Sequence, residues 1–274
     1  MSIVPTNVNY TYNLLRSNLI SLNTIYPFLN IQIVGNSVMG KNIYVVKLGK
    51  GPNKVFYSGG IHANEYITCT LLMKFIEDYA TAYVQDSSLY GYNVRNLFNS
   101  SSIYIMPMVN PDAINLVTGS LPTNSFAYER ALSIANNFPN IPFPSGWKAN
   151  INGVDLNLQF PAGWEQAKEI KYSQGFNQPA PRDFVGYGPL TEPESLAIYN
   201  FTLMHDFKLV IAYHTQGQEI YWQFQNFNPP NSLEIGEKFS QASGYKLSET
   251  PYNSSFAGYK DWFIQTYNRP RLYN

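Results

Sequence analysis

The stretch KVFYSGGIHANE (residues 54–65) decides how this chain folds. Its first five residues alternate in polarity as a strand does, and two glycines then turn the backbone. Residues 66–83 continue with apolar side chains at helical spacing, and residues 102–109 form a near-continuous apolar run of the kind found in buried strands. The order strand, helix, strand predicts an α/β fold.

Further elements follow on both sides of this unit. Residues 10–25 predict an opening helix that Tyr26-Pro27 ends. Residues 42–48 predict a strand that pairs with residues 54–58 around the turn at 49–53. We also predict a helix from about 193 to 206 with Thr191 as its cap, a buried strand over 208–213, and helices over 232–243 and 257–267. Together they predict one domain over residues 1–274, a mixed sheet with helices on both faces.

Two long stretches interrupt this pattern, residues 110–154 and residues 160–190. The first is rich in Pro, Asn, Gly and Ser, and the second is of the same kind. Each is too long for an ordinary connection. We therefore expect each to be a functional loop region or to contain short helices.

Composition limits the partners and the compartment. Eighteen Lys and Arg balance eighteen Asp and Glu, so we expect neither nucleic acid nor an anionic membrane as a partner, and we expect a monomer. The single Cys69 cannot form an internal disulfide and is predicted to be a small buried apolar residue. The N-terminal residues lack the pattern of a secretion signal, and no segment has the ~20 apolar residues that span a bilayer. The cytoplasm is the default expectation, which leaves release to the cell wall or spore open.

Candidate metal ligands follow the glycine turn. His62 and Glu65 lie three residues apart where a strand ends and a helix begins, so an imidazole nitrogen and a carboxylate can converge on one point. Catalytic Zn²⁺ takes three protein ligands, and two His with one Glu is a known set. His214 closes the apolar strand at 209–213, whereas His205 lies on a helical pattern. By themselves, His62 and Glu65 fit helix capping and surface hydrogen bonds equally well.

Four sequence motifs favour metal binding over helix capping, because together they resemble the motifs of a known family. They are GGIHANE (59–65), NPD (110–112), GVDLN (153–157) and AYHT (212–215), and they resemble the successive signatures of the zinc carboxypeptidase family. The similarity extends from about Tyr44 to Asp261. Within the family, GWKAN (146–150) and QFPAGW (159–164) are most similar to the bacterial branch that cleaves γ-D-glutamyl-diamino acid bonds in cell-wall peptides.

The resemblance implies a fold, a cofactor and a reaction. The fold is a mixed sheet of eight strands flanked by helices, and the cofactor is one Zn²⁺ bound by His62, Glu65 and His214. A water on the metal attacks the carbonyl of a peptide substrate.

The resemblance also implies three further site residues. Asn157 corresponds to a substrate-binding asparagine, Lys148 to the basic residue that stabilises the developing oxyanion, and Tyr252 to a mobile tyrosine that caps the substrate. A solvated surface lysine and a structural tyrosine are equally good readings of Lys148 and Tyr252.

The sequence departs from the family pattern at two places. Leu158 stands where an arginine clamps the terminal carboxylate of the substrate, so ordinary C-terminal residues are expected to bind poorly. The family's general-base glutamate would fall just past Asn274. We therefore expect the last strand and helix of the fold to be missing, apolar surface to be exposed at that edge, and both stability and peptidase activity to be low.

Three hypotheses follow. The chain is a cell-wall peptide hydrolase in which Glu219 or Glu249 replaces the missing base, a protein that binds zinc and peptide without chemistry, or an inactive remnant of a disrupted gene. Turnover that disappears in Glu65→Ala supports the first, and zinc and peptide binding without cleavage supports the second. Downstream DNA that encodes the glutamate out of frame supports the third.

Overall fold

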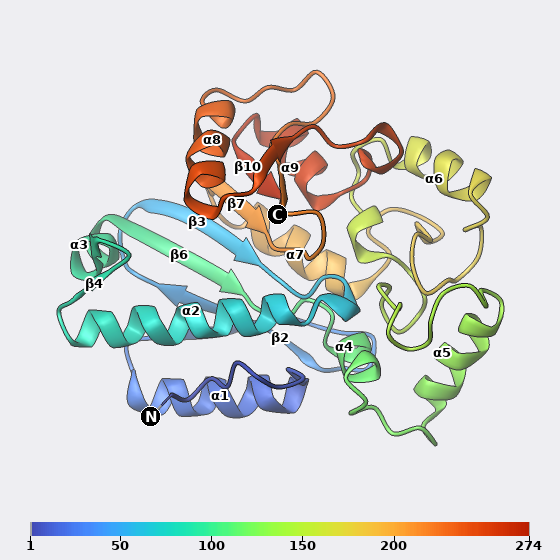
Figure 1. Ribbon diagram of the computed structural model, residues 1–274, viewed down its shortest axis with the longest axis horizontal. Coiled ribbons are helices and arrows are strands. Elements are labelled where there is room, and N and C mark those ends of the chain that lie inside the picture. Colours follow the sequence, from blue (N-terminus) through green and yellow to red (C-terminus); the bar gives the residue numbers. More distant parts are fainter. Residues whose placement is uncertain (1, 274) are drawn as a thin grey trace.

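An eight-stranded mixed sheet forms the centre of the structure (Figure 1). The computed structural model describes the backbone of residues 2–273 and the side chains of residues 2–270. From one edge to the other the strands are β1 (Asn30–Asn36), β2 (Asn42–Leu48), β6 (Ser101–Met106), β3 (Asn53–Ser58), β7 (Leu209–Ala212), β10 (Arg271–Tyr273), β8 (Glu219–Tyr221) and β9 (Lys246–Ser248). Strands β6, β3, β7 and β10 run parallel, so their carboxyl ends reach the same edge of the sheet.

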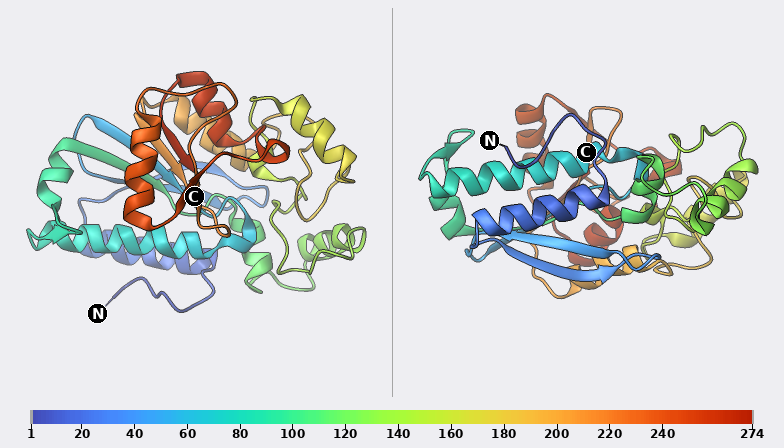
Figure 2. Two further views of the ribbon diagram at one scale, coloured as in Figure 1. Left: turned by 45° about the horizontal axis from the view of Figure 1, so that its top comes forward. Right: turned by 90° about the horizontal axis from the view of Figure 1, so that it is seen from below.

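Helices cover both faces of the sheet, and a separate core lies under each layer. Helices α1 (Tyr12–Ile25) and α2 (Ile67–Val84) lie side by side on one face (Figure 2), and α8 (Ser232–Ser243) packs over β8 and β9. Helices α7 (Pro193–Leu203) and α9 (Tyr259–Tyr267) pack on the other face. The remaining elements are α3 (Val94–Ser100), α4 (Pro111–Val117), α5 (Phe126–Asn136), α6 (Trp164–Ser173), a hairpin of β4 (Ser88–Leu89) and β5 (Tyr92–Asn93), and the 3₁₀ turns η1 (Ala63–Glu65), η2 (Leu156–Leu158) and η3 (Tyr252–Ser254).

The alternation of side chains along the strands explains the two cores. In β2, Val46 and Leu48 join the core beneath α1 and α2, whereas Ile43 and Val45 join the core beneath α7 and α9. Phe56 of β3 is fully buried in the second core. Burying such a side chain stabilises the fold by about 1.5–3 kcal/mol. Because side chains of the same strands enter both cores, these strands hold both helix layers.

Most of the predicted elements are confirmed, but one predicted pairing is wrong. Strands β2 and β3 are present, yet they do not pair with each other because β6 lies between them. The turn between them forms backbone hydrogen bonds to the chain that enters β6, from Lys50 N to Phe98 O and from Gly51 N to Ser101 O. These bonds place β6 next to both strands.

The start and end of α7 also differ from the prediction. Its N-cap is Glu192, because the Thr191 hydroxyl is hydrogen-bonded to Gln159 at 3.0 Å instead of capping the helix. The helix ends at Leu203, earlier than expected.

The strand that we expected to be missing is present for three residues as β10. It pairs with β7 and β8 in the interior of the sheet, where the backbone of β7 offers it hydrogen-bonding partners. Asn274 lies outside the described residues.

The two long stretches contain short helices and loops at the carboxyl edge of the sheet. Helices α4 and α5 belong to the first stretch and α6 to the second, and all three lie on the side toward which β3 and β6 run (Figure 1). Of the helices in the described part of the chain, none has both the length and the apolar character needed to cross a bilayer.

Candidate metal centre

A glycine turn after β3 positions two of the predicted ligands. Gly60 has φ +62°, in the left-handed region that glycine adopts readily, and a Cβ on it would lie 2.5 Å from Cys69 Sγ. The Gly60 amide donates to the Thr68 hydroxyl at 2.8 Å, which ties the turn to the start of α2. His62 and Glu65 follow as this tight turn leads into η1.

Strand β7 brings the third predicted ligand to the same place. β3 and β7 are parallel neighbours with Ser58 opposite Ala212, and the Tyr213 amide donates to the Ser58 carbonyl at 2.8 Å. His214 is the second residue after β7. The carboxyl ends of adjacent parallel strands therefore bring together side chains that are 149 to 152 residues apart in the chain.

The three side chains meet at one point. His62 Nδ1 lies 3.1 Å from Glu65 Oε1, His214 Nδ1 lies 2.8 Å from Glu65 Oε2, and the two Nδ1 atoms are 3.2 Å apart. Ligand atoms about 2.1 Å from a tetrahedral Zn²⁺ are about 3.4 Å from one another, so these separations nearly match those of a metal site. In the part of the chain that the structure describes, these three residues form the one group of His, Cys, Asp and Glu that could hold an ion.

A fourth side chain fixes the orientation of His62. Its Nε2 lies 3.2 Å from Oδ1 of Asp155, and a carboxylate only accepts hydrogen bonds, so Nε2 carries the proton. In the neutral ring the lone pair of Nδ1 then faces the Glu65 carboxylate and His214 Nδ1. A proton between an imidazole Nδ1 and the Glu65 carboxylate can hold these atoms together, and a divalent cation bound by all three can take its place. The donor set of two imidazoles and a carboxylate therefore fits a zinc ion.

The two carboxylates beside His62 favour a positive charge there, whereas burial disfavours one on His214. Burial lowers the pKa of His62, but the carboxylates of Glu65 and Asp155 raise it by more, to about 9. Burial lowers the pKa of His214 to about 4, and the positive charges of His62 and Lys148 act in the same direction. Burial raises the pKa of Glu65, but the two imidazoles outweigh this effect and hold it well below its usual range.

Lys148 borders this group and is not a solvated surface lysine. It is only 9% exposed, and its Nζ lies 3.1 Å from Oε1 of Glu65. The backbone around it also supports η1, because the amides of Ala63 and Asn64 donate to the carbonyls of Lys148 and Trp147, both at 3.1 Å. One segment thus places a cation beside the candidate metal ligands and holds their backbone in place.

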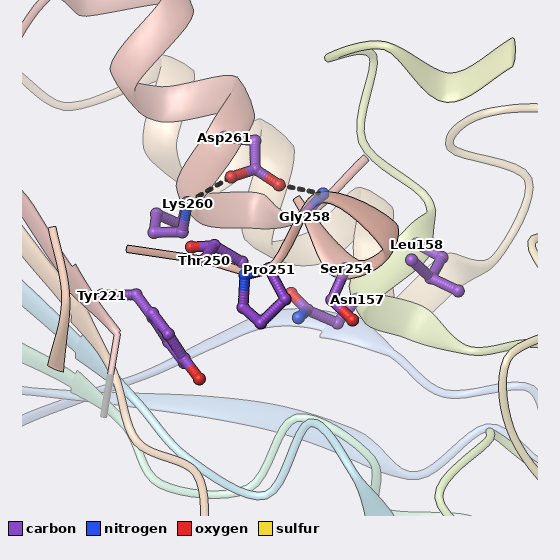
Figure 3. Close-up of a pocket in the computed structure, with 9 residues that line it drawn as sticks. All are labelled: Asn157, Leu158, Tyr221, Thr250, Pro251, Ser254, Gly258, Lys260 and Asp261. Atoms are coloured by element: carbon purple, nitrogen blue, oxygen red, sulfur yellow. Dashed lines mark hydrogen bonds and ion pairs between the residues drawn. The ribbon is translucent and has the colours of Figure 1, made fainter. Parts of the chain in front are cut away.

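Asn157 lies between two neighbouring pockets. One pocket also contains His62, Lys148 and Asp155, and the other extends toward the start of α9. Figure 3 shows the second pocket, where the carboxylate of Asp261 binds Lys260 and accepts a hydrogen bond from the Gly258 amide. Leu158 and Ser254 line both pockets as well, so the two pockets are neighbours along one side of the ligand group, and we call them together the cleft.

Tyr252, the predicted substrate cap, lies elsewhere. Its side chain is 65% exposed and packs edge-on against Phe256 with ring centroids 5.2 Å apart. It lines a third pocket together with Glu249.

The other candidates from the sequence are also outside the metal group. Glu219 accepts hydrogen bonds from the hydroxyls of Tyr221 and Ser248, and the Nδ1 of His205 binds the Phe201 carbonyl. Tyr252, Glu219, Glu249 and His205 are therefore not brought together with His62, Glu65 and His214.

Sequence reasoning missed two residues of this region. Asp155 belongs to the GVDLN motif, so its place in a signature was visible, but its bond to His62 depends on a turn 93 residues away. Arg182 lines the pocket that contains His62, Lys148 and Asn157, and no local pattern distinguishes it from other loop arginines.

Comparison with known proteins gives a consistent family. A sequence profile described as zinc carboxypeptidase matches residues 15–270. The gamma-D-glutamyl-L-diamino acid endopeptidase 1 of Lysinibacillus sphaericus is 41% identical over 268 residues, which cover 98% of this chain and 65% of the relative. The uncharacterized protein YqgT of Bacillus subtilis (strain 168) is 37% identical over 245 residues, which cover 89% of this chain and 63% of that protein. The chain thus spans just under two thirds of the length of these two curated relatives.

Solved structures share the fold. Thrombin activatable fibrinolysis inhibitor aligns with a TM-score of 0.72 at 18% identity, covering 99% of this chain and 68% of that one. The murein-tripeptide amidase MpaA from Escherichia coli O157 aligns with a TM-score of 0.54, also at 18% identity, covering 89% and 81%. Identities this low establish the common architecture alone.

Proposed function

This chain belongs to the zinc carboxypeptidase family, and we propose that it is a zinc-dependent peptide hydrolase whose substrates are cell-wall peptides with a γ-D-glutamyl-diamino acid bond. The observation that carries the proposal is the convergence of His62 Nδ1, Glu65 and His214 Nδ1 to within 2.8–3.2 Å of one another beside a cleft. The name of the Lysinibacillus relative supports the substrate class.

In this proposal His62, Glu65 and His214 hold one zinc ion. A zinc ion with an open coordination position polarises a carbonyl oxygen and brings the pKa of a bound water to about 7. Asp155 contributes by accepting a hydrogen bond from the Nε2–H of His62, which keeps the lone pair of Nδ1 directed at the ligand group. Removing Asp155 is therefore expected to weaken zinc binding without removing a ligand.

Lys148 and Asn157 act on the substrate in this proposal. The Lys148 ammonium group is next to Glu65 and lines the same pocket as His62, so it is close enough to stabilise the negative oxygen that forms on the attacked carbonyl. Asn157 lies at the junction of the two pockets, where its side chain amide can hydrogen-bond to a bound peptide. Leu158 beside it is apolar and offers no partner to a terminal carboxylate.

A second candidate function is zinc and peptide binding without chemistry. One observation favours it. In residues 2–270, the carboxylates that line the pockets containing His62 or His214 are Asp155 and Asp183, and both are already held by other side chains. Neither Glu219 nor Glu249 lines those pockets, which counts against either as the replacement for the general base.

The two functions are separated by measuring hydrolysis of L-alanyl-γ-D-glutamyl-meso-diaminopimelate at a known zinc content. The hydrolase predicts release of the diamino acid, loss of turnover with a chelator, recovery with added zinc, and no turnover in Glu65→Ala. His205→Ala is the matched control, because His205 lies outside the ligand group. Stoichiometric zinc and peptide binding without cleavage would establish the binding protein instead.

A further inference from the structure

The loop that carries Arg182 is anchored against the candidate metal centre. The Pro181 carbonyl accepts hydrogen bonds from the amides of Lys148 and Ala149, at 2.8 and 2.9 Å. The Asp183 amide donates to Oδ2 of Asp155 at 3.1 Å. Since Asp155 also binds His62, the position of this loop is fixed relative to the ligand group.

Asp183 holds two cations at the wall of the cleft. Its Oδ1 lies 2.6 Å from Lys171 Nζ and its Oδ2 lies 2.6 Å from Arg182 Nε. Its backbone has φ +65°, a left-handed conformation that is uncommon outside glycine and that aspartate adopts more readily than most other residues. The hydrogen bond to Asp155 and the two ion pairs fix Asp183, and Asp183 in turn holds Lys171 and Arg182 in place.

Three cationic side chains line the cleft, and two of them, Lys171 and Arg182, share the single carboxylate of Asp183. Lys148, Lys171 and Arg182 line the pocket of about 170 Å³ beside His62, and its only carboxylates among the described side chains are Asp155 and Asp183. Glu65 offsets the charge of Lys148, so a bound zinc ion would leave the cleft with a positive excess. The vacant part of this pocket is therefore suited to an anionic group.

Arg182 has the donors that an anionic group needs. Its ion pair with Asp183 uses Nε, and no partner for its two terminal NH₂ groups is found among residues 2–270. The side chain is 43% exposed, so a ligand in the cleft can reach it. A guanidinium group binds a carboxylate through two parallel N–H bonds, which an ammonium group cannot do.

We propose that Arg182, with Lys171 beside it, binds a free carboxylate of the substrate next to the bond that is cleaved. This inference rests on the proposed function and specifies its substrate class. A glutamyl residue linked through its γ-carboxyl keeps its α-carboxylate free, whereas an α-linked glutamate in mid-chain has no carboxylate at that position. Arg182 thereby selects γ-linked glutamyl peptides and rejects those in which the α-carboxyl is an amide.

The test compares two peptides that differ in one group. L-alanyl-γ-D-glutamyl-L-lysinamide has the α-carboxylate of glutamate as its only carboxylate, and its D-isoglutamine counterpart has an amide there. Their dissociation constants are measured by calorimetry on the zinc-loaded 274-residue chain and on Arg182→Gln and Arg182→Lys. Arg95→Gln is the matched control, because Arg95 forms a similarly exposed ion pair with Asp86 at 3.1 Å, away from the cleft.

The wild type and Arg95→Gln are expected to bind the acid about tenfold more tightly than the amide, as a charge-assisted hydrogen bond would produce. Arg182→Gln loses this preference, and Arg182→Lys keeps part of it because it retains charge without the planar fork. Equal affinity of the wild type for both peptides, or an unchanged preference in Arg182→Gln, would overturn the inference.

A different result is expected if the γ-glutamyl peptide is not the substrate. If neither peptide binds, N-acetyl-D-glutamate is titrated while the Nε–H resonance of Arg182 is followed by NMR, assigned as the signal absent from Arg182→Lys. A shift of that resonance would keep the carboxylate site and reject the peptide substrate. No shift would reject the site.

Discussion

The Nε2 atom of His62 lies 3.2 Å from Oδ1 of Asp155, and the other ring nitrogen faces Glu65. This pair connects the candidate metal centre to the loop that lines the cleft, because the second oxygen of Asp155 accepts the Asp183 amide. One buried carboxylate thus sets the tautomer of a candidate metal ligand and the position of the loop that carries Arg182.

Replacing Asp155 by asparagine is expected to lower zinc affinity about 10- to 100-fold, because a neutral amide accepts a weaker hydrogen bond from His62 Nε2 than a carboxylate does. Affinity is measured by competition with a coloured chelator. Asp78→Asn is the control, since Asp78 forms an exposed ion pair with Lys74. Unchanged zinc affinity in Asp155→Asn would show that Asp155 does not support zinc binding.

Replacing Lys148 by glutamine is expected to reduce kcat on a γ-D-glutamyl peptide by about 10²-fold or more while zinc content stays the same, because an oxyanion loses its positive partner. Lys148→Arg should retain most of the activity. Lys238→Gln, which removes a lysine from an exposed ion pair with Glu234, serves as the reference for a lost surface charge. A rise in KM alone would mean that Lys148 binds the ground state and does not stabilise the reaction.

Gly60→Ala is expected to destabilise the fold by about 2–5 kcal/mol, because the new Cβ combines a left-handed backbone with a 2.5 Å approach to Cys69 Sγ. Gly40→Ala separates the two effects. Gly40 has φ +77° with nothing within 4 Å of an added Cβ, so this variant should lose only about 1 kcal/mol. Equal losses in urea unfolding would show that the contact with Cys69 is unimportant.

Glu194 is expected to make stability fall as the pH rises from about 4.5 to 7. Its side chain is completely buried, and burial together with the charge of Asp112 raises its pKa to about 7 from 4.5. Between these pH values the folded chain keeps a proton that the unfolded chain releases, so the stabilisation present at low pH is lost. The shift corresponds to about 3 kcal/mol.

Urea unfolding of the wild type and Glu194→Gln at pH 5 and pH 7.5 measures this effect. The variant cannot titrate at this position, so the stability difference between the two proteins should change by about 2 kcal/mol between the two pH values, the rest of the effect being already lost at pH 5. A constant difference would show that Glu194 has the same pKa in the folded and unfolded chains.

The sequence predicted most of the long elements but not the seven-residue strand β1, and it missed the short strands. Helix α8 could be predicted to the residue because its apolar spacing ends at Gly244, which adopts φ +74° at the C-cap. Strands β8 and β9 have three residues each, too few to show a period. The position of β6 between β2 and β3 depends on contacts between segments far apart in the chain, which no local pattern records.

The sequence could predict those residues of the candidate site that directly follow a strand. His62 and His214 follow the parallel strands β3 and β7, and strand ends are visible in the sequence as apolar runs that stop. The role of Asp155 and the presence of Arg182 were not visible. Both depend on a loop that is held by hydrogen bonds to Lys148 and Asp155, and that loop has no periodic pattern of its own.

The zinc stoichiometry of purified protein tests the central claim most directly. Wild type and the His205→Ala variant are expected to bind one zinc ion per chain, because His205 binds a backbone carbonyl and lies outside the ligand group. His62→Ala and His214→Ala are expected to lose it after dialysis against a weak chelator. A wild-type chain that binds no zinc, or a His214→Ala chain that retains as much as His205→Ala, would contradict the account.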